Sequence, residues 1–355
     1  MKIPLNALLA SLLLFALLPA AYAQNQGGDE RLRQVLKRFP EADLNKDGKL
    51  EREELEQYKK KRQGTRTGER NNASAQLAPT HQDVKYGKHE KQDFDIWLAK
   101  SKDGKKTPLV IYIHGGGFRG GDKKRVNATW VKSYLEQGIS FASMNYRLSD
   151  VGAYPMMMND AARGLQLIRS KEDEWNLDSK RIACFGGSAG AGISLWLAFH
   201  DDLVDEKSED PVARQSTRIV AAATLSGQST YDLRTFREWF EVPNLKPHPA
   251  MDAFYGLRDQ EDWKSDRVIK LMEDASAITH LDKDDVPVFM TYGKGDSPVD
   301  ENTNPSVWVH HVRLGMKLKQ AMDKLGVENH LSWRDHPSKE YKDLHAFLSE
   351  KVLAD

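Results

Sequence analysis

Most of the structural information lies in two glycine-rich stretches, Ile113-His114-Gly115-Gly116-Gly117-Phe118 and Phe185-Gly186-Gly187-Ser188-Ala189-Gly190. Each follows an apolar run of β type, at 109–113 and 182–185. A serine with glycines two residues to either side, between a strand and a helix, is typical of a nucleophile elbow. The His-Gly-Gly-Gly loop lets backbone N–H groups approach the anionic oxygen of a tetrahedral intermediate. Together the motifs predict a serine hydrolase; the alternative is two glycine turns and a buried serine.

The pattern from Asp83 onward alternates strands with helices, which predicts a mostly parallel sheet with crossover helices. We expect strands at 94–99, 110–113, 140–145, 182–185, 220–225, 288–292 and 330–334. We expect helices at 128–136, 158–169, 193–200, 314–325 and 341–353. The expected hydrolase domain is 83–355, with an aromatic-rich, cap-like insertion at 228–278 and a polar linker at 59–82 before it.

The N-terminal segment 1–23 reads as a signal peptide, because a charged start precedes a short apolar run and Ala21-Tyr22-Ala23. We therefore expect an exported, periplasmic or extracellular protein without a membrane span after cleavage. Lys plus Arg and Asp plus Glu both number 52, so no net charge favours nucleic acid or a membrane surface. Cys184 is the sole cysteine, which excludes a disulfide within the chain, and it is expected to be a small buried side chain.

A small helical unit at 28–58 contains the spacing of an EF-hand calcium loop. The expected Ca²⁺ ligands occupy six of the twelve loop positions, the fourth through its carbonyl and the fifth through water: Asp43, Asn45, Asp47, Lys49, Glu51 and Glu54. Gly48 stands where the loop needs a sharp turn. Since EF-hands usually pair and only one is visible, we expect a structural or attachment role; the alternative is a solvated acidic turn.

A serine hydrolase also needs a base and an acid, which follow the serine in the chain order of this fold. Asp296 is the first carboxylate after the strand 288–292 and is the expected acid, with Asp300 in reserve. The alternative for Asp296 is a turn residue that accepts from local backbone amides. For the base we favour His336, after the last strand. The alternatives are His345 and His311, and His310 could also reach the site.

Residues 83–355 resemble an α/β-hydrolase of the esterase/lipase group, close to the BD-FAE-type and acetylxylan-esterase-like proteins. Beyond the glycine loop and the elbow, the matching stretches are 94–98, 121–123, 145–148 and 287–296. The resemblance implies Ser188 as nucleophile and Gly116, Gly117 and Ala189 as donors of the oxyanion N–H groups. One departure is the last turn, where Arg334-Asp335-His336-Pro337 replaces the Gly-His-Gly-like turn of the family. The added EF-hand is similar to exported proteins of planctomycete-type bacteria.

The function we expect is an exported carboxylesterase that hydrolyses acyl esters, including those carried by polysaccharides, and that needs no cofactor for catalysis. An arylformamidase-like or peptidase-like hydrolase is a second hypothesis. A third is a non-catalytic, calcium-dependent binding or adhesion module. Reaction of Ser188 with a fluorophosphonate would separate the enzymes from the binding module.

Overall fold

The computed structural model describes residues 32, 36, 40–55, 57–58, 77–101, 104–334 and 336–354. The chain divides into two units, residues 1–76 and 77–355. The expected signal peptide at 1–23 and most of the expected linker lie outside the described residues. Within the first unit, a short 3₁₀ helix, η1 (Pro40–Ala42), precedes the acidic loop.

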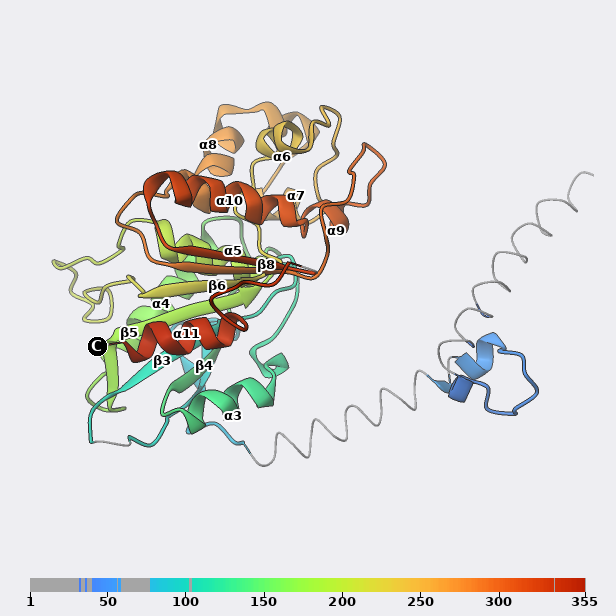
Figure 1. Ribbon diagram of the computed structural model, residues 1–355. Helices are drawn as coiled ribbons and strands as arrows, with labels where there is room; N and C mark the ends of the chain where they lie inside the picture. Colours follow the sequence, from blue (N-terminus) through green and yellow to red (C-terminus); the bar gives the residue numbers. More distant parts are fainter. Residues whose placement is uncertain are drawn as a thin grey trace, which may run out of the picture. The chain divides into compact units, whose positions relative to one another are not determined.

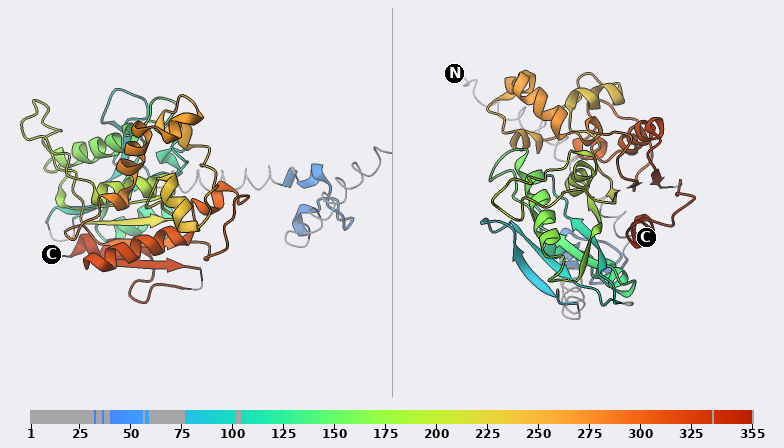
Figure 2. Two further views of the ribbon diagram at one scale, coloured as in Figure 1. Left: turned by 90° about the horizontal axis from the view of Figure 1, so that it is seen from above. Right: turned by 90° about the vertical axis from the view of Figure 1, so that its left-hand side faces the viewer.

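The second unit is built on one eight-stranded sheet in the order β1-β2-β4-β3-β5-β6-β7-β8. β2 runs antiparallel to β1 and β4. The six neighbouring strands β4, β3, β5, β6, β7 and β8 pair in parallel. The strands are β1 (His81–Lys85), β2 (Asp93–Trp97), β3 (Thr107–Ile113), β4 (Ser140–Met144), β5 (Leu177–Gly187), β6 (Ala221–Leu225), β7 (Val288–Tyr292) and β8 (Asn329–Trp333). This mostly parallel sheet is the α/β-hydrolase fold expected from the sequence. In Figure 2, right, the cyan N-terminal strands and the red C-terminal segments lie on opposite sides of the unit.

Helices cover both faces of the sheet (Figure 1). On one face lie α3 (Ala128–Glu136) and α11 (Leu344–Leu353), and on the other lie α4 (Met156–Ser170), α5 (Ala189–Phe199) and α10 (Val312–Leu325). The insertion forms α6 (Leu233–Phe240), α7 (Met251–Tyr255), η3 (Gln260–Lys264), α8 (Asp266–Ala275) and η4 (Ala277–Thr279). The remaining helices are η2 (Lys123–Arg125) and α9 (Pro305–Trp308).

The core consists of two apolar layers because the central strands are buried on both faces. In β3, Leu109 and Ile111 point into the layer under α4 and α5, whereas Val110 points into the layer under α3 and α11. Cys184 of β5 is fully buried, and burial raises the pKa of its thiol to about 12. This confirms it as a small core side chain. Among the described residues, no helix combines the length and apolar character needed to cross a membrane.

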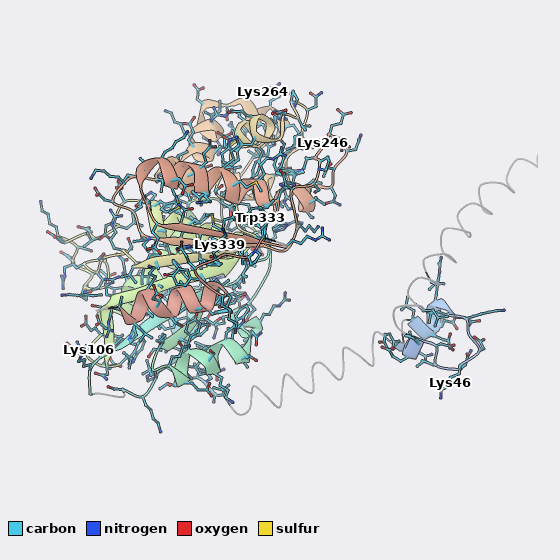
Figure 3. All side chains as sticks on the ribbon, in the orientation of Figure 1. Lys46, Lys106, Lys246, Lys264, Trp333 and Lys339 are labelled. Atoms are coloured by element: carbon cyan, nitrogen blue, oxygen red, sulfur yellow. The ribbon has the colours of Figure 1, made fainter. Side chains whose placement is uncertain are left out.

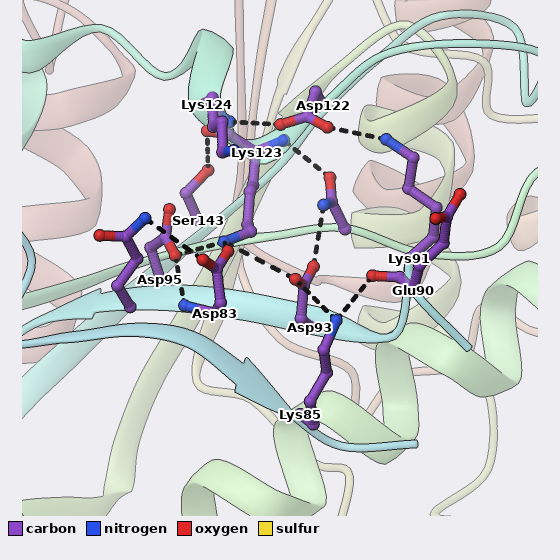
Figure 4. Close-up of polar contacts among 12 residues, drawn as sticks. Asp83, Lys85, Glu90, Lys91, Asp93, Asp95, Asp122, Lys123, Lys124 and Ser143 are labelled. Carbon is purple, nitrogen blue, oxygen red and sulfur yellow. Dashed lines mark hydrogen bonds and ion pairs between the residues drawn. The ribbon is translucent and has the colours of Figure 1, made fainter. Parts of the chain in front are cut away.

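A buried lysine joins the antiparallel edge of the sheet to the segment after the glycine loop (Figure 4). Lys123 is only 1% exposed, and its ammonium contacts the carboxylates of Asp83 and Asp95, with Asp93 at 3.8 Å. Its backbone N–H donates to Asn145 Oδ1 over 2.7 Å. The network fixes the start of η2 against β1 and β2, and it includes Lys123 and Asn145 from the matching stretches 121–123 and 145–148.

Replacement of Lys123 by methionine is expected to lower the free energy of unfolding by about 3–5 kcal/mol, because it leaves the buried Asp95 carboxylate without its cation. Urea unfolding followed by circular dichroism measures the change. The exposed neighbour Lys124 provides the matched control, and Lys124→Met should change stability by no more than ~0.5 kcal/mol. Equal effects of the two substitutions would contradict the assigned role of the buried ion pair.

Candidate active site

Ser188 lies in the turn between β5 and α5, with φ 50° and ψ −119°. This strained conformation holds the hydroxyl at the carboxyl end of the central strands. The turn needs glycines on both sides of Ser188, because neighbouring backbone leaves no room for a Cβ at these positions. A Cβ on Gly186 would lie 2.4 Å from the carbonyl carbon of Gly190, and one on Gly190 would lie 2.1 Å from the Ile113 carbonyl oxygen. The geometry is therefore that of the elbow expected from the sequence.

The side chain that meets Ser188 is His310, in the short segment between α9 and α10. Its Nε2 lies 2.8 Å from Ser188 Oγ, and its Nδ1 lies 2.9 Å from the backbone carbonyl oxygen of Ser306. Because a carbonyl only accepts, Nδ1 carries the proton in the neutral ring, and Nε2 accepts the serine hydroxyl proton. This tautomer is the one that a general base needs.

The structure differs here from our expectation for the base, His336. That side chain is exposed and stacks on Trp333, the last residue of β8, which is labelled in Figure 3. The backbone explains the placement, since Trp333 and His336 form a β bridge that folds the loop back onto the end of β8. In the described part of the chain, His336 has no hydrogen bond to Ser188. We therefore assign the role of candidate base to His310 and not to His336.

The two alternative histidines have structural contacts. His345 lies in α11, where its Nδ1 is 3.0 Å from the Tyr134 hydroxyl and burial lowers its pKa. His311 caps α10: its Nδ1 accepts from the Arg313 N–H over 3.1 Å, and its Nε2 lies 2.9 Å from the Ser297 carbonyl oxygen. Burial also lowers the pKa of His311. Both are thus neutral packing groups.

Asp296 follows β7 but is not paired with the candidate base. Its carboxylate accepts from the Arg313 guanidinium over 3.0 Å and lies 3.7 Å from His311 Nε2. Within the described ranges it makes no hydrogen bond to His310, whose Nδ1 is bonded to Ser306 instead. The other carboxylate considered, Asp300, bonds to Asn302 and Thr303 in its own turn. The structure thus places the backbone carbonyl of Ser306, and not Asp296 or Asp300, beside the candidate base.

The glycine loop lies beside Ser188 in a conformation that only glycines adopt readily. Gly116 and Gly117 have φ of 129° and 61°, and a Cβ on Gly116 would lie 2.1 Å from the Gly120 carbonyl oxygen. Ala189 begins α5, whose first N–H groups have no partner within the helix. His114 is buried and stacks on Tyr146 at 4.4 Å, and burial lowers its pKa. His114 therefore has a structural role in the loop.

Two cavities adjoin the Ser188–His310 pair, which lines both of them. The first has a volume of about 620 Å³ and is mainly apolar, with its walls formed by Phe118, Tyr231, Phe236, Met251 and Trp308. The second, of about 600 Å³, lies toward Tyr112, Leu225 and Lys294. An ester carbonyl at Ser188 would thus have separate space for its acyl and alcohol parts.

The polar side chains of the first cavity carry positive charge or none. It is lined by Arg119, Gln228 and His248, and no acidic residue among those described lines either cavity. His248 Nδ1 accepts from the Ala250 N–H over 3.2 Å, which directs its other nitrogen away from that turn. Burial and the nearby charges of His310 and Arg119 hold the pKa of His248 below its ordinary value. His248 is thus a neutral side chain that lines the same cavity as Ser188.

A second candidate site is the acidic loop of the first unit. Gly48, with φ 80°, donates its N–H to Asp43 Oδ2 over 2.9 Å, and the Asn45 and Glu51 N–H groups donate to the two carboxylate oxygens of Glu54 over 3.2 and 3.1 Å. Lys49 donates its N–H to Asp47 Oδ1 over 2.8 Å. Glu54, the last residue of the loop, therefore accepts from the backbone near both the beginning and the end of the loop.

Comparison with known proteins shows that the second unit is similar to ester hydrolases. Residues 94–309 match the BD-FAE family model. The probable carboxylic ester hydrolase LipM of Mycobacterium tuberculosis is 28% identical over 221 residues, covering 61% of this chain and 48% of the relative. A probable isoprenylcysteine α-carbonyl methylesterase of Arabidopsis thaliana is 28% identical over 162 residues, covering 46% and 37%. The chain thus spans about half the length, or less, of these curated relatives.

Solved structures share the fold. A truncated carbohydrate esterase from gut microbiota superposes with a TM-score of 0.59 at 18% identity, covering 78% of this chain and all (100%) of that chain. An esterase of the planctomycete Thermogutta terrifontis, with propionate bound, gives a TM-score of 0.52 at 18% identity, covering 71% and 81%. At these sequence identities the structural similarity establishes the fold only. The reaction must be inferred from the residues around Ser188.

Proposed function

Because the chain belongs to the BD-FAE family, we propose that it is a carboxylic ester hydrolase with Ser188 as nucleophile and His310 as base. The observation that carries the proposal is the 2.8 Å contact between Ser188 Oγ and His310 Nε2 at a strained elbow. A buried serine in an ordinary turn would need neither the strained backbone nor a histidine aligned on its hydroxyl.

The first half of the reaction is attack of Ser188 Oγ on the ester carbonyl while His310 Nε2 takes the hydroxyl proton. The ring then carries a proton on each nitrogen, and the Ser306 carbonyl oxygen, 2.9 Å from Nδ1, stabilises the positive charge and fixes the ring plane. His310 next gives the Nε2 proton to the leaving alcohol, which departs and leaves Ser188 acylated. Water repeats the sequence and releases the acid.

The charge on the carbonyl oxygen needs preorganised donors. We propose the backbone N–H groups of Gly116, Gly117 and Ala189, since the glycine loop and the first turn of α5 both lie beside Ser188 in the first cavity. Two of these donors come from backbone in the left-handed region, so side chains larger than hydrogen at 116 and 117 would strain the loop.

For the substrate we propose acyl esters carried by polysaccharides. Two cavities of about 620 and 600 Å³ flank the serine, so both parts of the ester can be larger than a methyl group. Fold neighbours include a carbohydrate esterase and an acetyl ester-xyloside bifunctional hydrolase. We assign the sugar to the second cavity, because the Lys294 side chain and the Gly293 backbone offer polar contacts there.

A substrate panel tests this function. We expect hydrolysis of p-nitrophenyl acetate and butyrate and release of acetate from acetylated xylan, with Ser188→Ala as the blank. N-formylkynurenine and a peptide p-nitroanilide test the amide-cleaving alternatives. Higher kcat/KM on either amide than on the esters would overturn the esterase proposal, and so would failure to hydrolyse any ester.

We further propose that the first unit binds Ca²⁺ and that residues 1–23 direct export to the periplasm or beyond. The donor types fit this ion, because Asp43, Asn45, Asp47 and Glu54 all carry side-chain oxygens, and Asp43 Oδ1 is buried without a hydrogen-bond partner. Oxygen donors of this kind are what Ca²⁺ prefers. The Lys49 carbonyl and Glu51 complete the set expected from the loop spacing. N-terminal sequencing of protein secreted by an expression host tests export, with Gln24 as the expected first residue.

Calcium should bind with a dissociation constant on the order of 10⁻⁴ to 10⁻³ M, as in extracellular modules. Glu54→Gln should weaken binding most, since this residue supplies two of the oxygens. Calorimetry measures both. Ester hydrolysis should be unchanged by EGTA, because the acidic loop and Ser188 belong to separate units joined by the long polar stretch 59–82. A large loss of turnover with EGTA, restored by Ca²⁺, would show instead that the ion controls catalysis.

A further inference from the structure

A cluster of metal-binding side chains lies at the end of α5 remote from Ser188. His200 caps the C-terminus of α5, Asp274 lies in α8, and His280 caps η4. One nitrogen of each ring and one carboxylate oxygen lie within 4.8 Å of one another. Since α5 has 11 residues, this cluster is about 16 Å from the nucleophile along the helix axis. It is therefore separate from the active site.

Two of the three side chains are already oriented by contacts of their other polar atom. His200 Nδ1 lies 3.0 Å from the Asp201 carbonyl oxygen, so its proton is on Nδ1 and Nε2 keeps its lone pair. The His200 ring also stacks on Trp196 at 3.9 Å. Tyr154 donates its hydroxyl to Asp274 Oδ2 over 2.6 Å, which leaves Oδ1 for a cation. Such outer contacts orient histidine and carboxylate ligands in metal sites.

The third side chain, His280, faces the other two. Its Nε2 lies 3.9 Å from Asp274 Oδ1 and 2.8 Å from the Asp274 carbonyl oxygen, and its ring centroid lies 4.7 Å from that of His200. To bind a cation, the His280 ring turns away from this carbonyl and toward Asp274 Oδ1 and His200. Among the described residues, Asp274 forms no ion pair with a lysine or arginine. Its negative charge is therefore available to a bound ion.

We propose that His200, Asp274 and His280 bind a divalent cation of the zinc class. Two imidazoles and one carboxylate suit Zn²⁺, whereas Ca²⁺ prefers oxygen donors alone. Tetrahedral Zn²⁺ with bonds of ~2.0–2.1 Å places its ligand atoms about 3.4 Å apart, so side-chain rotations of about 1 Å complete the site. Water fills the fourth position. The ion ties the end of α5 to α8 and η4, which close the insertion over the sheet.

The test uses the full chain, stripped with EDTA and then saturated with Ca²⁺ so that the acidic loop is filled. Titration with ZnCl₂ should show one tight equivalent by calorimetry. A hundredfold excess over the dissociation constant should raise the melting temperature by about 5 °C. Ester hydrolysis should be the same with and without the ion, because the cluster does not touch the reacting atoms.

Variants identify the ligands. His280→Gln and Asp274→Asn should each weaken Zn²⁺ binding at least tenfold and remove the metal-dependent rise in melting temperature. Asparagine still accepts from Tyr154, and comparing each variant with and without metal separates binding from folding. His336→Gln, a change at an exposed histidine outside the cluster, should bind like the wild type. No tight equivalent in the wild type, or unchanged binding in both ligand variants, would overturn the proposal.

Discussion

Replacing Ser188 with alanine is expected to lower kcat on p-nitrophenyl acetate by about 10⁵–10⁶-fold, to the level left by binding and the oxyanion donors. The hydroxyl removed is the one that His310 Nε2 contacts at 2.8 Å. Because alanine has the same backbone preferences in the strained turn, the melting temperature should change by only a few degrees. Initial rates and a thermal melt of the same preparation measure both effects. A folded variant that keeps more than about 1% of the activity would remove Ser188 from the mechanism.

His310→Ala is expected to be nearly as damaging as Ser188→Ala, because nucleophile and base act as one unit. His336→Ala is the matched control, since His336 is exposed and stacks on Trp333. It should leave kcat within about twofold of the wild type. Asp296→Asn should cost far less than His310→Ala, because the Asp296 carboxylate bonds to Arg313 and not to the base. An inactive His336→Ala with an active His310→Ala would reverse our assignment.

The elbow at Ser188 was predictable because its strained turn requires particular residues close together in the sequence. Glycines two residues to either side of Ser188 are required by backbone that passes 2.1–2.4 Å from where a Cβ would lie. The alternation of apolar runs likewise predicted the sheet, and the strand at Val288–Tyr292 and the helix at Ala128–Glu136 have the expected bounds.

The contact of His310 with Ser188 was not predictable by the same means. His310 reaches Ser188 through the path of the chain from β7 to α10, and no periodicity or spacing records that path. In the sequence, the only indication of this contact is that two histidines, His310 and His311, precede α10. The last helix was predicted to begin at residue 341, but it begins three residues later, at Leu344. Asp343 caps it there by accepting from the N–H groups of His345 and Ala346. Helices α6 to α8 of the insertion and strand β1 were likewise missed, since their short amphipathic runs are ambiguous from sequence.

We propose that Ser188 and His310 form a nucleophile–base pair, and covalent labelling with a fluorophosphonate tests this pairing. Intact mass followed by peptide mapping should show a single adduct, on the peptide that contains Ser188. The rate of labelling should fall by at least a hundredfold in His310→Ala and stay unchanged in His336→Ala. An adduct at another serine, no adduct at all, or equal labelling rates in the wild type and His310→Ala would contradict the claim.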